Sequence, residues 1–366
     1  MKRVLLAFCF IALVAACSSN DGEDTTTQSY DRTALLTNWA DNIIIPAYQN
    51  YVGKAGTLSN KATAYTQNLD AASLAELRTA WLEAYVAYQS VAMYDFGKAA
   101  DLYLKQSANT FPTDANGIQA NIASGTYNLN QQVQFSKQGF PAIDYLINGL
   151  GSDAETIATY ANNENAKIYL VAVANQLKTI AETVTADWTG NYRNTYISNN
   201  GTSVTSSINK TTNNFVKNLE KDIRTGKLGI PAGLFSNGVV YADKVEGFYK
   251  NDVSKLLLNA GIQAEQDFFN GKAFNSSATG ASLKSALDAV NAVRESSKLS
   301  DIINNQFTAI YAANNELNDS FSQQILTDNT KMVTAYNTLQ QNVVYIKLDM
   351  MQALNITIDY VDGDGD

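Results

Sequence analysis

The stretch from Ser73 to Val91, SLAELRTAWLEAYVAYQSV, decides the fold class. Its apolar side chains recur three and four positions apart, which is the spacing of one face of an α-helix. They are Leu74, Leu77, Trp81, Ala84, Tyr88 and Val91. The opening residues, Ser73 to Glu76, have the capping-box pattern, in which a serine and a glutamate bind the backbone N–H groups of a helix start. The stretch therefore predicts an amphipathic helix that begins near Ser73.

The same spacing returns along most of the chain. It recurs at Leu170, Val173, Leu177, Ile180, Val184 and Trp188, and again at Met332, Tyr336, Leu339, Val343 and Ile346. Helices are also expected over residues 31–55, 208–223, 252–269 and 282–316. The whole chain has only four prolines, which suits long helices. The clearest expected strand is Asn355 to Val361, where apolar and polar residues alternate. We predict an all-α body.

The amino terminus predicts export and lipidation. Lys2 and Arg3 precede an apolar run, Val4 to Ala16, that is too short for a permanent transmembrane helix. Small residues then lead to Cys17, the pattern of a lipoprotein cleavage site, so residues 1–16 are expected to be a signal peptide and Cys17 to be acylated. Residues 17–30 are polar and acidic and suit a flexible tether. Ser18 follows the cysteine instead of aspartate, which favours the outer membrane.

The length of the chain predicts more than one helical layer. The residues that follow Ala16 number about 350, more than one hydrophobic core usually serves. Two domains or one long bundle would accommodate them. The polar segment from Thr189 to Ser206 is the best candidate boundary. We therefore predict two packed helical-bundle halves, at residues 31–195 and 196–366.

Composition excludes several classes of function. The chain carries 26 lysines and arginines against 35 aspartates and glutamates, and loss of Lys2 and Arg3 leaves a net charge of −11. Such a charge argues against a nucleic acid partner, which requires clustered basic residues. Cys9 would leave with the signal peptide and Cys17 would be acylated, so no thiol remains for a disulfide or metal site. The chain has no histidine, which removes histidine-based triads and imidazole metal sites. Carboxylate chemistry remains, and with it a hard cation or iron as a candidate cofactor.

One segment resembles a known family. Residues 139–149, GFPAIDYLING, resemble the signature of the imelysin-like family, GxHxxE followed by apolar residues and a glycine. Other stretches resemble further parts of that family in the same order: Ala80-Trp81 leading to Phe96-Gly97, then 111–114, 229–233 and 245–249. The resemblance runs from about Asp31 to the end of the chain.

The resemblance implies two helical halves with the signature where they meet. Members of the family are exported proteins, often lipoproteins, that are linked to iron uptake, and some are classed as insulin-cleaving metallopeptidases. This chain has Pro141 at the histidine position and Asp144 at the glutamate position. A metallopeptidase needs a metal-bound water, and the imidazole that would hold the metal is missing. The expected function is therefore a non-catalytic binding protein, with the membrane through its lipid and the iron-uptake machinery as partners; the alternative is a peptidase whose metal is held by carboxylates.

The candidate ligand-binding residues are Gly139, Asp144, Asp114 and Glu246. Each also has a structural explanation. Gly139 suits the loop before a helix, and Pro141 suits the first turn of that helix. Asp144 is then expected near the positive end of the helix, either as a capping or buried hydrogen-bonding group or as a ligand contact. Asp114 and Glu246 are lone carboxylates beside loops, and such groups are usually solvated.

Overall fold

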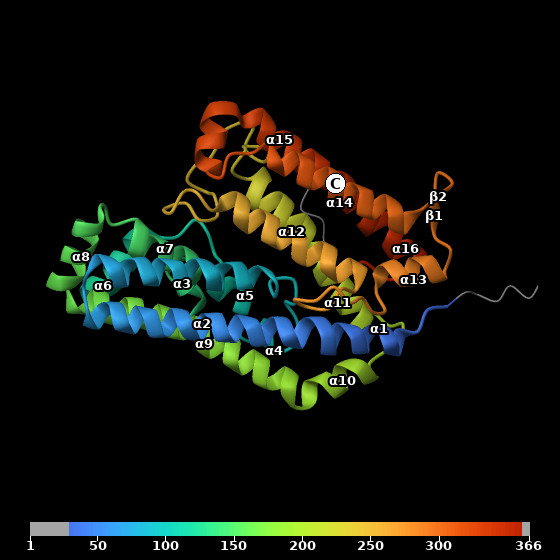
Figure 1. Cartoon of the computed structure of the whole chain (residues 1–366), viewed down its shortest axis with the longest axis horizontal. Coiled ribbons are helices and arrows are strands. Elements are labelled where there is room, and N and C mark those ends of the chain that lie inside the picture. Colours follow the sequence, from blue (N-terminus) through green and yellow to red (C-terminus); the bar gives the residue numbers. More distant parts are fainter. Residues whose placement is uncertain (1–28, 361–366) are drawn as a thin grey trace, which may run out of the picture.

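The computed structural model describes residues 29–360, and the regular elements of these residues are nearly all helices (Figure 1). The all-α prediction is confirmed. Within the described residues, the paired strands are β1 (Val293–Arg294) and β2 (Ser297–Lys298), which form one short hairpin. The predicted signal peptide, Cys17, most of the tether and the acidic end of the chain lie outside the described residues. No helix between residues 29 and 360 is long and apolar enough to cross a bilayer.

Three long helices form the frame of the N-terminal half. The first runs through α1 (Arg32–Asn38), the π-helical turn η1 (Trp39–Ile44) and α2 (Ile45–Gln67). It packs against both α3 (Ala71–Gln89) and α9 (Glu164–Asp187). The remaining elements of this half are α4 (Lys98–Asp101), α5 (Leu104–Ala108), α6 (Ala115–Ser124), η2 (Gln132–Lys137), α7 (Gly139–Asn148) and α8 (Asp153–Asn162).

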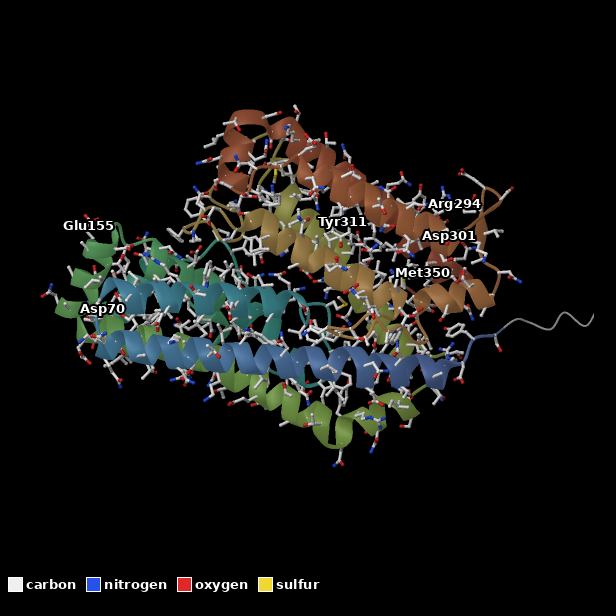
Figure 2. The ribbon with its side chains drawn as sticks, in the orientation of Figure 1. Asp70, Glu155, Arg294, Asp301, Tyr311 and Met350 are labelled. Atoms are coloured by element: carbon white, nitrogen blue, oxygen red, sulfur yellow. The ribbon has the colours of Figure 1, made fainter. Side chains whose placement is uncertain are left out.

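The helix predicted at Ser73 exists but begins earlier, at Ala71. Asp70 is its N-cap: the Asp70 carboxylate accepts the Ser73 N–H at 2.8 Å, and the Ser73 hydroxyl oxygen accepts the Asp70 N–H. The predicted pairing of Ser73 with Glu76 is therefore wrong, because Ser73 is already inside the first turn. Glu76 instead binds Lys61 on α2. A second capping box, Ser152 with Glu155, starts α8, and Figure 2 shows Asp70 and Glu155 at the same end of the molecule.

The C-terminal half contains a second set of long helices. The chain continues from α9 through η3 (Trp188–Tyr192) and α10 (Arg193–Ser198), which packs against α1. The elements that follow are α11 (Ser207–Lys217), η4 (Asn218–Gly229), α12 (Ser254–Asn270), α13 (Leu283–Ala289), α14 (Leu299–Asn315), α15 (Phe321–Val344), η5 (Tyr345–Met350) and α16 (Met351–Ala353). The single helix predicted over 282–316 is wrong. The β1–β2 hairpin divides it, because Asn291, Glu295 and Ser296 adopt left-handed backbone angles that no α-helix contains.

The strand predicted over 355–361 is also wrong within the described residues. The segment is not helical, but it has no strand partner. Side chains of α11 bind its backbone in place of a neighbouring strand. Asn209 accepts the Thr357 N–H, and Asn213 donates to the Thr357 carbonyl and accepts the Asp359 N–H. Alternation in the sequence cannot distinguish a strand from an extended segment whose backbone binds asparagine side chains.

The two halves share one continuous hydrophobic core. Buried residues connect without a break from Leu35 to Ile356. The Trp39 ring stacks on Phe268 of α12 with ring centroids 4.8 Å apart, and α12 also packs against α3. The proposed boundary between 195 and 196 stays a prediction, since the buried residues of both halves belong to one cluster. The candidate site lies at the junction, the region where the two halves pack against each other.

Candidate functional site

The signature segment forms α7, and its glycine is required by the backbone. Gly139 has a φ of +79°, and a Cβ atom there would lie 2.3 Å from the Ala108 carbonyl oxygen. Only glycine tolerates both conditions. Pro141 lies in the first turn, as predicted. The neighbouring α3 supports the helix, because the Trp81 indole donates to the Phe140 carbonyl at 3.0 Å and the Tyr85 ring stacks on Phe140.

Asp144 joins α7 to the other half of the molecule. Its side chain is buried, with 1% of its surface exposed. Its oxygens accept the backbone N–H groups of Tyr249 and Lys250, each at 3.0 Å, and the Asn148 amide at 2.9 Å. Burial raises the pKa of Asp144 to about 7, and these three donors oppose the rise. Of the roles expected for Asp144, the structure shows the buried hydrogen-bonding one: it does not cap its own helix but binds N–H groups of a segment about a hundred residues away.

Glu246 lies at the other end of that segment and is also buried, with 1% exposure. It accepts the Asn109 amide at 2.7 Å, the Gln89 amide at 3.1 Å and the Lys227 ammonium at 2.5 Å. The expectation of a solvated carboxylate is wrong here, because a lysine and two amides replace water. Gln89 and Asn109 belong to the N-terminal half and Lys227 to η4, so Glu246 also connects the halves.

Asp114 has a local role. Its carboxylate accepts the Gly117 N–H at 2.8 Å and caps α6. It takes no part in the contacts of Asp144 or Glu246. The structure therefore brings Asp144 and Glu246 to the junction of the halves, the first on α7 and the second on the segment that Asp144 binds. It leaves Gly139 against α5 within the N-terminal half and Asp114 at the start of α6.

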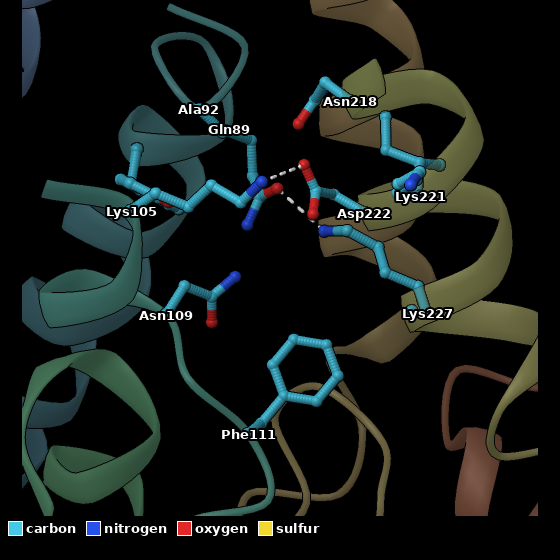
Figure 3. Close-up of a pocket in the computed structure, with 12 residues that line it drawn as sticks. Gln89, Ala92, Lys105, Asn109, Phe111, Asn218, Lys221, Asp222 and Lys227 are labelled. Carbon is cyan, nitrogen blue, oxygen red and sulfur yellow. Dashed lines mark hydrogen bonds and ion pairs between the residues drawn. The ribbon is translucent and has the colours of Figure 1, made fainter. Parts of the chain in front are cut away.

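Two of the cavities between the halves lie beside these carboxylates and their partners. The first, here the Asp144 cavity, has a volume of about 120 Å³ and is lined by Phe111, Pro112, Thr113, Pro141, Asp144, Asp243, Val245, Gly247, Phe248 and Tyr249. The second, here the Lys105 cavity, has a volume of about 100 Å³. Its polar lining is Gln89, Lys105, Asn109, Asn218, Lys221, Asp222 and Lys227 (Figure 3). Phe111 lines both cavities and separates them.

Comparison with known proteins matches most of the chain to one family. The model of the imelysin peptidase family matches residues 44–347. The chain belongs to the imelysin family. Iron-regulated protein A of Synechococcus elongatus is 26% identical over 160 residues, a match that covers 42% of this chain and 41% of that protein. The match thus spans less than half the length of this curated relative.

Solved structures of imelysin relatives share the fold. An imelysin-like protein from Psychrobacter arcticum superposes with a TM-score of 0.70 at 17% identity, covering 90% of this chain and 97% of that one. A protein from Parabacteroides distasonis, assigned as an iron-regulated protein A precursor, gives the same TM-score, identity and coverage. The predicted family and the all-helical architecture are thereby confirmed, and the names of two relatives associate them with iron regulation.

The signature residues of this imelysin do not fit a peptidase metal. Pro141 has no side-chain donor, and three N–H groups already bind the Asp144 oxygens. Asp243 is the other carboxylate that lines the Asp144 cavity. Zinc sites in enzymes use three protein ligands. Among residues 29–360, no cluster of three or more His, Cys, Asp or Glu side chains is arranged to hold a metal ion.

The sequence did not single out the partners of Glu246. Gln89, Asn109 and Lys227 are an amide, an amide and a lysine that resemble ordinary surface residues in sequence. Gln89 and Lys227 are nevertheless buried. A signal was available at Gln89, which directly follows the apolar stripe position Tyr88, but its partner lies 157 positions away. Only the fold brings these groups together.

Proposed function

We propose that this imelysin is a non-catalytic binding protein of the cell envelope, tethered to the outer membrane by a lipid on Cys17, that serves the uptake of iron or another ligand. The proposal rests on the two residues at the histidine and glutamate positions of the signature segment. Its histidine position holds Pro141, and the carboxylate of Asp144 is committed to the backbone of the opposite half. Binding requires neither a metal-bound water nor an imidazole.

Support for an iron link comes from the relatives. The Synechococcus and Parabacteroides proteins carry the name iron-regulated protein A, and the latter is called a precursor, which agrees with an exported protein. The acidic charge of the chain suits a cation or a cationic complex. The Asp144 cavity, with Asp243 exposed at its edge, is the proposed position for such a ligand.

The alternative is a peptidase that holds its metal with carboxylates alone. It would need Asp144 to release the Tyr249 and Lys250 N–H groups and a second ligand to approach it. Releasing buried N–H groups costs about 1 to 3 kcal/mol each when nothing replaces the acceptor. This cost favours the binding proposal.

The test pairs binding with cleavage. The full chain is titrated calorimetrically with ferric and ferrous iron, calcium and zinc, and is incubated with peptides with and without a chelator. We expect no chelator-sensitive cleavage. A cation bound in the Asp144 cavity should bind about tenfold more weakly to Asp243→Asn, because a charged contact is lost. Asp252→Asn is the matched control, since Asp252 is exposed on the same segment but does not line the cavity.

Two results would overturn the proposal. Metal-dependent peptide cleavage that disappears in Asp144→Asn would show that the site is catalytic without histidine. Normal growth of a deletion strain under iron limitation would remove the link to iron.

A further inference from the structure

The Lys105 cavity lies between the halves, and its two walls differ in chemistry. Figure 3 shows Lys105, Gln89 and Asn109 on one side and Asn218, Asp222 and Lys227 on the other, with Phe111 below. The first three belong to the N-terminal half, and the last three belong to η4. The Lys105 ammonium reaches across to Asp222, with N and O atoms 2.5 Å apart.

Lys227 has no hydrogen-bonding capacity left for a ligand. An ammonium group has three donors. Those of Lys227 go to Gln89 Oε1 at 2.7 Å, Glu246 Oε2 at 2.5 Å and the Leu257 carbonyl at 3.4 Å. Its charge is matched by Glu246. Lys227 therefore shapes the cavity and does not bind its contents.

Lys105 and Asp222 do have unused capacity. Within the described residues, Lys105 donates one side-chain hydrogen bond, to Asp222 Oδ2, which leaves two of its three N–H donors. Asp222 Oδ1 accepts no hydrogen bond from residues 29–360. Neither side chain is fully buried, since 24% and 31% of their surfaces are exposed. The pair can therefore open without unfolding the core around it.

Two amide side chains beside this pair, Asn109 and Asn218, also have one unused hydrogen-bonding group each. Asn109 uses one amide N–H on Glu246 and its carbonyl on Tyr85, so its second N–H remains as a donor. Asn218 uses its amide on Glu265, and its carbonyl oxygen has no partner among the described residues. Among these four residues, the unused donors lie on the N-terminal side of the cavity and the unused acceptors lie on η4, which also carries the lining cations Lys221 and Lys227.

We propose that the Lys105 cavity binds a small zwitterion, a free α-amino acid, between the two halves. Its carboxylate takes the donors of Lys105 and Asn109, and its ammonium takes the acceptors of Asp222 and Asn218. The Lys105–Asp222 ion pair is then replaced by two ion pairs, one between Lys105 and the ligand carboxylate and one between Asp222 and the ligand ammonium. This site is separate from the Asp144 cavity and does not depend on the function proposed for it.

Charge and size both select this class of ligand. An anion bound to Lys105 would take away the cation that Asp222 pairs with, and a cation bound to Asp222 would take away the anion that Lys105 pairs with; breaking an ion pair in a partly enclosed site is costly. The volume of about 100 Å³ is well below that of a drug-sized site and admits only a few heavy atoms. Phe111 and Ile223 provide apolar surface for a short side chain.

The first experiment uses the unaltered full chain. Glycine, alanine and serine are titrated calorimetrically, each beside its methyl ester, which lacks the carboxylate, and its N-acetyl derivative, which lacks the ammonium. We expect the free amino acids to bind, and we expect each derivative to bind at least about tenfold more weakly, since each loses a charged hydrogen-bond pair. Absence of binding by all three amino acids, or equal binding of the derivatives, would overturn the proposal and indicate a water-filled cavity.

The second experiment locates the site. Lys105→Met and Asp222→Asn should each weaken amino acid binding about tenfold or more. Lys54→Met and Glu83→Gln are matched controls, because Lys54 and Glu83 form a 2.8 Å pair between α2 and α3, away from the cavity. Circular dichroism checks that each variant is folded. Unchanged affinity in a folded Lys105→Met variant would place the ligand elsewhere and reject the site. The derivative series decides the ligand class even if a variant fails to fold.

Discussion

Replacing Asp144 with asparagine should change how the stability of the protein depends on pH. The wild-type carboxyl is buried at the junction, and burial raises its pKa to about 7 from an ordinary value of 3.8. An asparagine does not ionise. Its single oxygen can still accept one of the N–H groups of Tyr249 and Lys250 that Asp144 binds. The substitution therefore removes the titration while it keeps the shape of the side chain.

The size and sign follow from the two pKa values of Asp144. Below the unfolded value of 3.8 the carboxyl is protonated in both states, and its contribution to folding is fully present. As pH rises the unfolded chain ionises first, so stability falls until pH passes the folded pKa of about 7. Each pKa unit corresponds to about 1.4 kcal/mol, so the full loss is about 4 kcal/mol.

The assay is urea unfolding followed by circular dichroism at a series of pH values. The unfolding free energy of the wild type minus that of Asp144→Asn should fall by about 4 kcal/mol between about pH 4 and pH 8. Taking the difference cancels the titration of the other carboxylates. Asp301→Asn is the control, since Asp301 is an exposed carboxylate in the first turn of α14. Parallel pH curves for wild type and Asp144→Asn would refute the argument that burial controls this carboxyl.

Three further predictions concern other parts of the chain. The Cys17→Ser variant should no longer incorporate a fatty-acid analogue and should no longer partition into detergent, whereas retained label would exclude lipidation at Cys17. Lys227→Met should lower the unfolding free energy by about 3 to 5 kcal/mol, because it leaves the buried Glu246 charge unpaired, and adding Glu246→Gln should restore part of the loss in the same urea assay. Gly139→Ala should cost more than about 1 kcal/mol in thermal unfolding, while Gly53→Ala, in open space on a helix, should be neutral or stabilising.

The fold was predictable because its signals are local. The spacing of three and four between Leu74 and Val91 depends only on neighbouring turns, and α3 follows it closely. One error was local, a turn inside an expected helix, and another arose where a distant group binds the segment. The helix expected over 282–316 gives way to a hairpin, and the segment after Asn355 binds Asn209 and Asn213 instead of another strand. Periodicity in one segment carries no information about such partners.

The site was less predictable, for the same reason. The sequence singled out Gly139 and Asp144, and the structure places Asp144 at the junction and Gly139 against α5 at the start of the same helix. It could not show that Asp144 binds the backbone of Tyr249 and Lys250, or that Glu246 is buried against Lys227, because these contacts join the two halves. The choice between a ligand contact and a structural contact depends on the hydrogen bonds of each carboxylate, and these exist only in the folded chain.

The surviving outline of the imelysin signature has a structural explanation that needs no metal. Gly139 is fixed by a carbonyl of α5, and a Cβ atom at Gly149 would lie 2.6 Å from the Tyr249 ring. Asp144 binds the N–H group of the same Tyr249 at 3.0 Å. These three positions therefore dock α7 onto its surroundings whether or not chemistry takes place there. The histidine position differs, since Pro141 lines the cavity and holds no partner through its side chain. A chain can thus lose the imidazole and keep the docking surface, so recognisable spacing in this segment is evidence for the fold and not for catalysis.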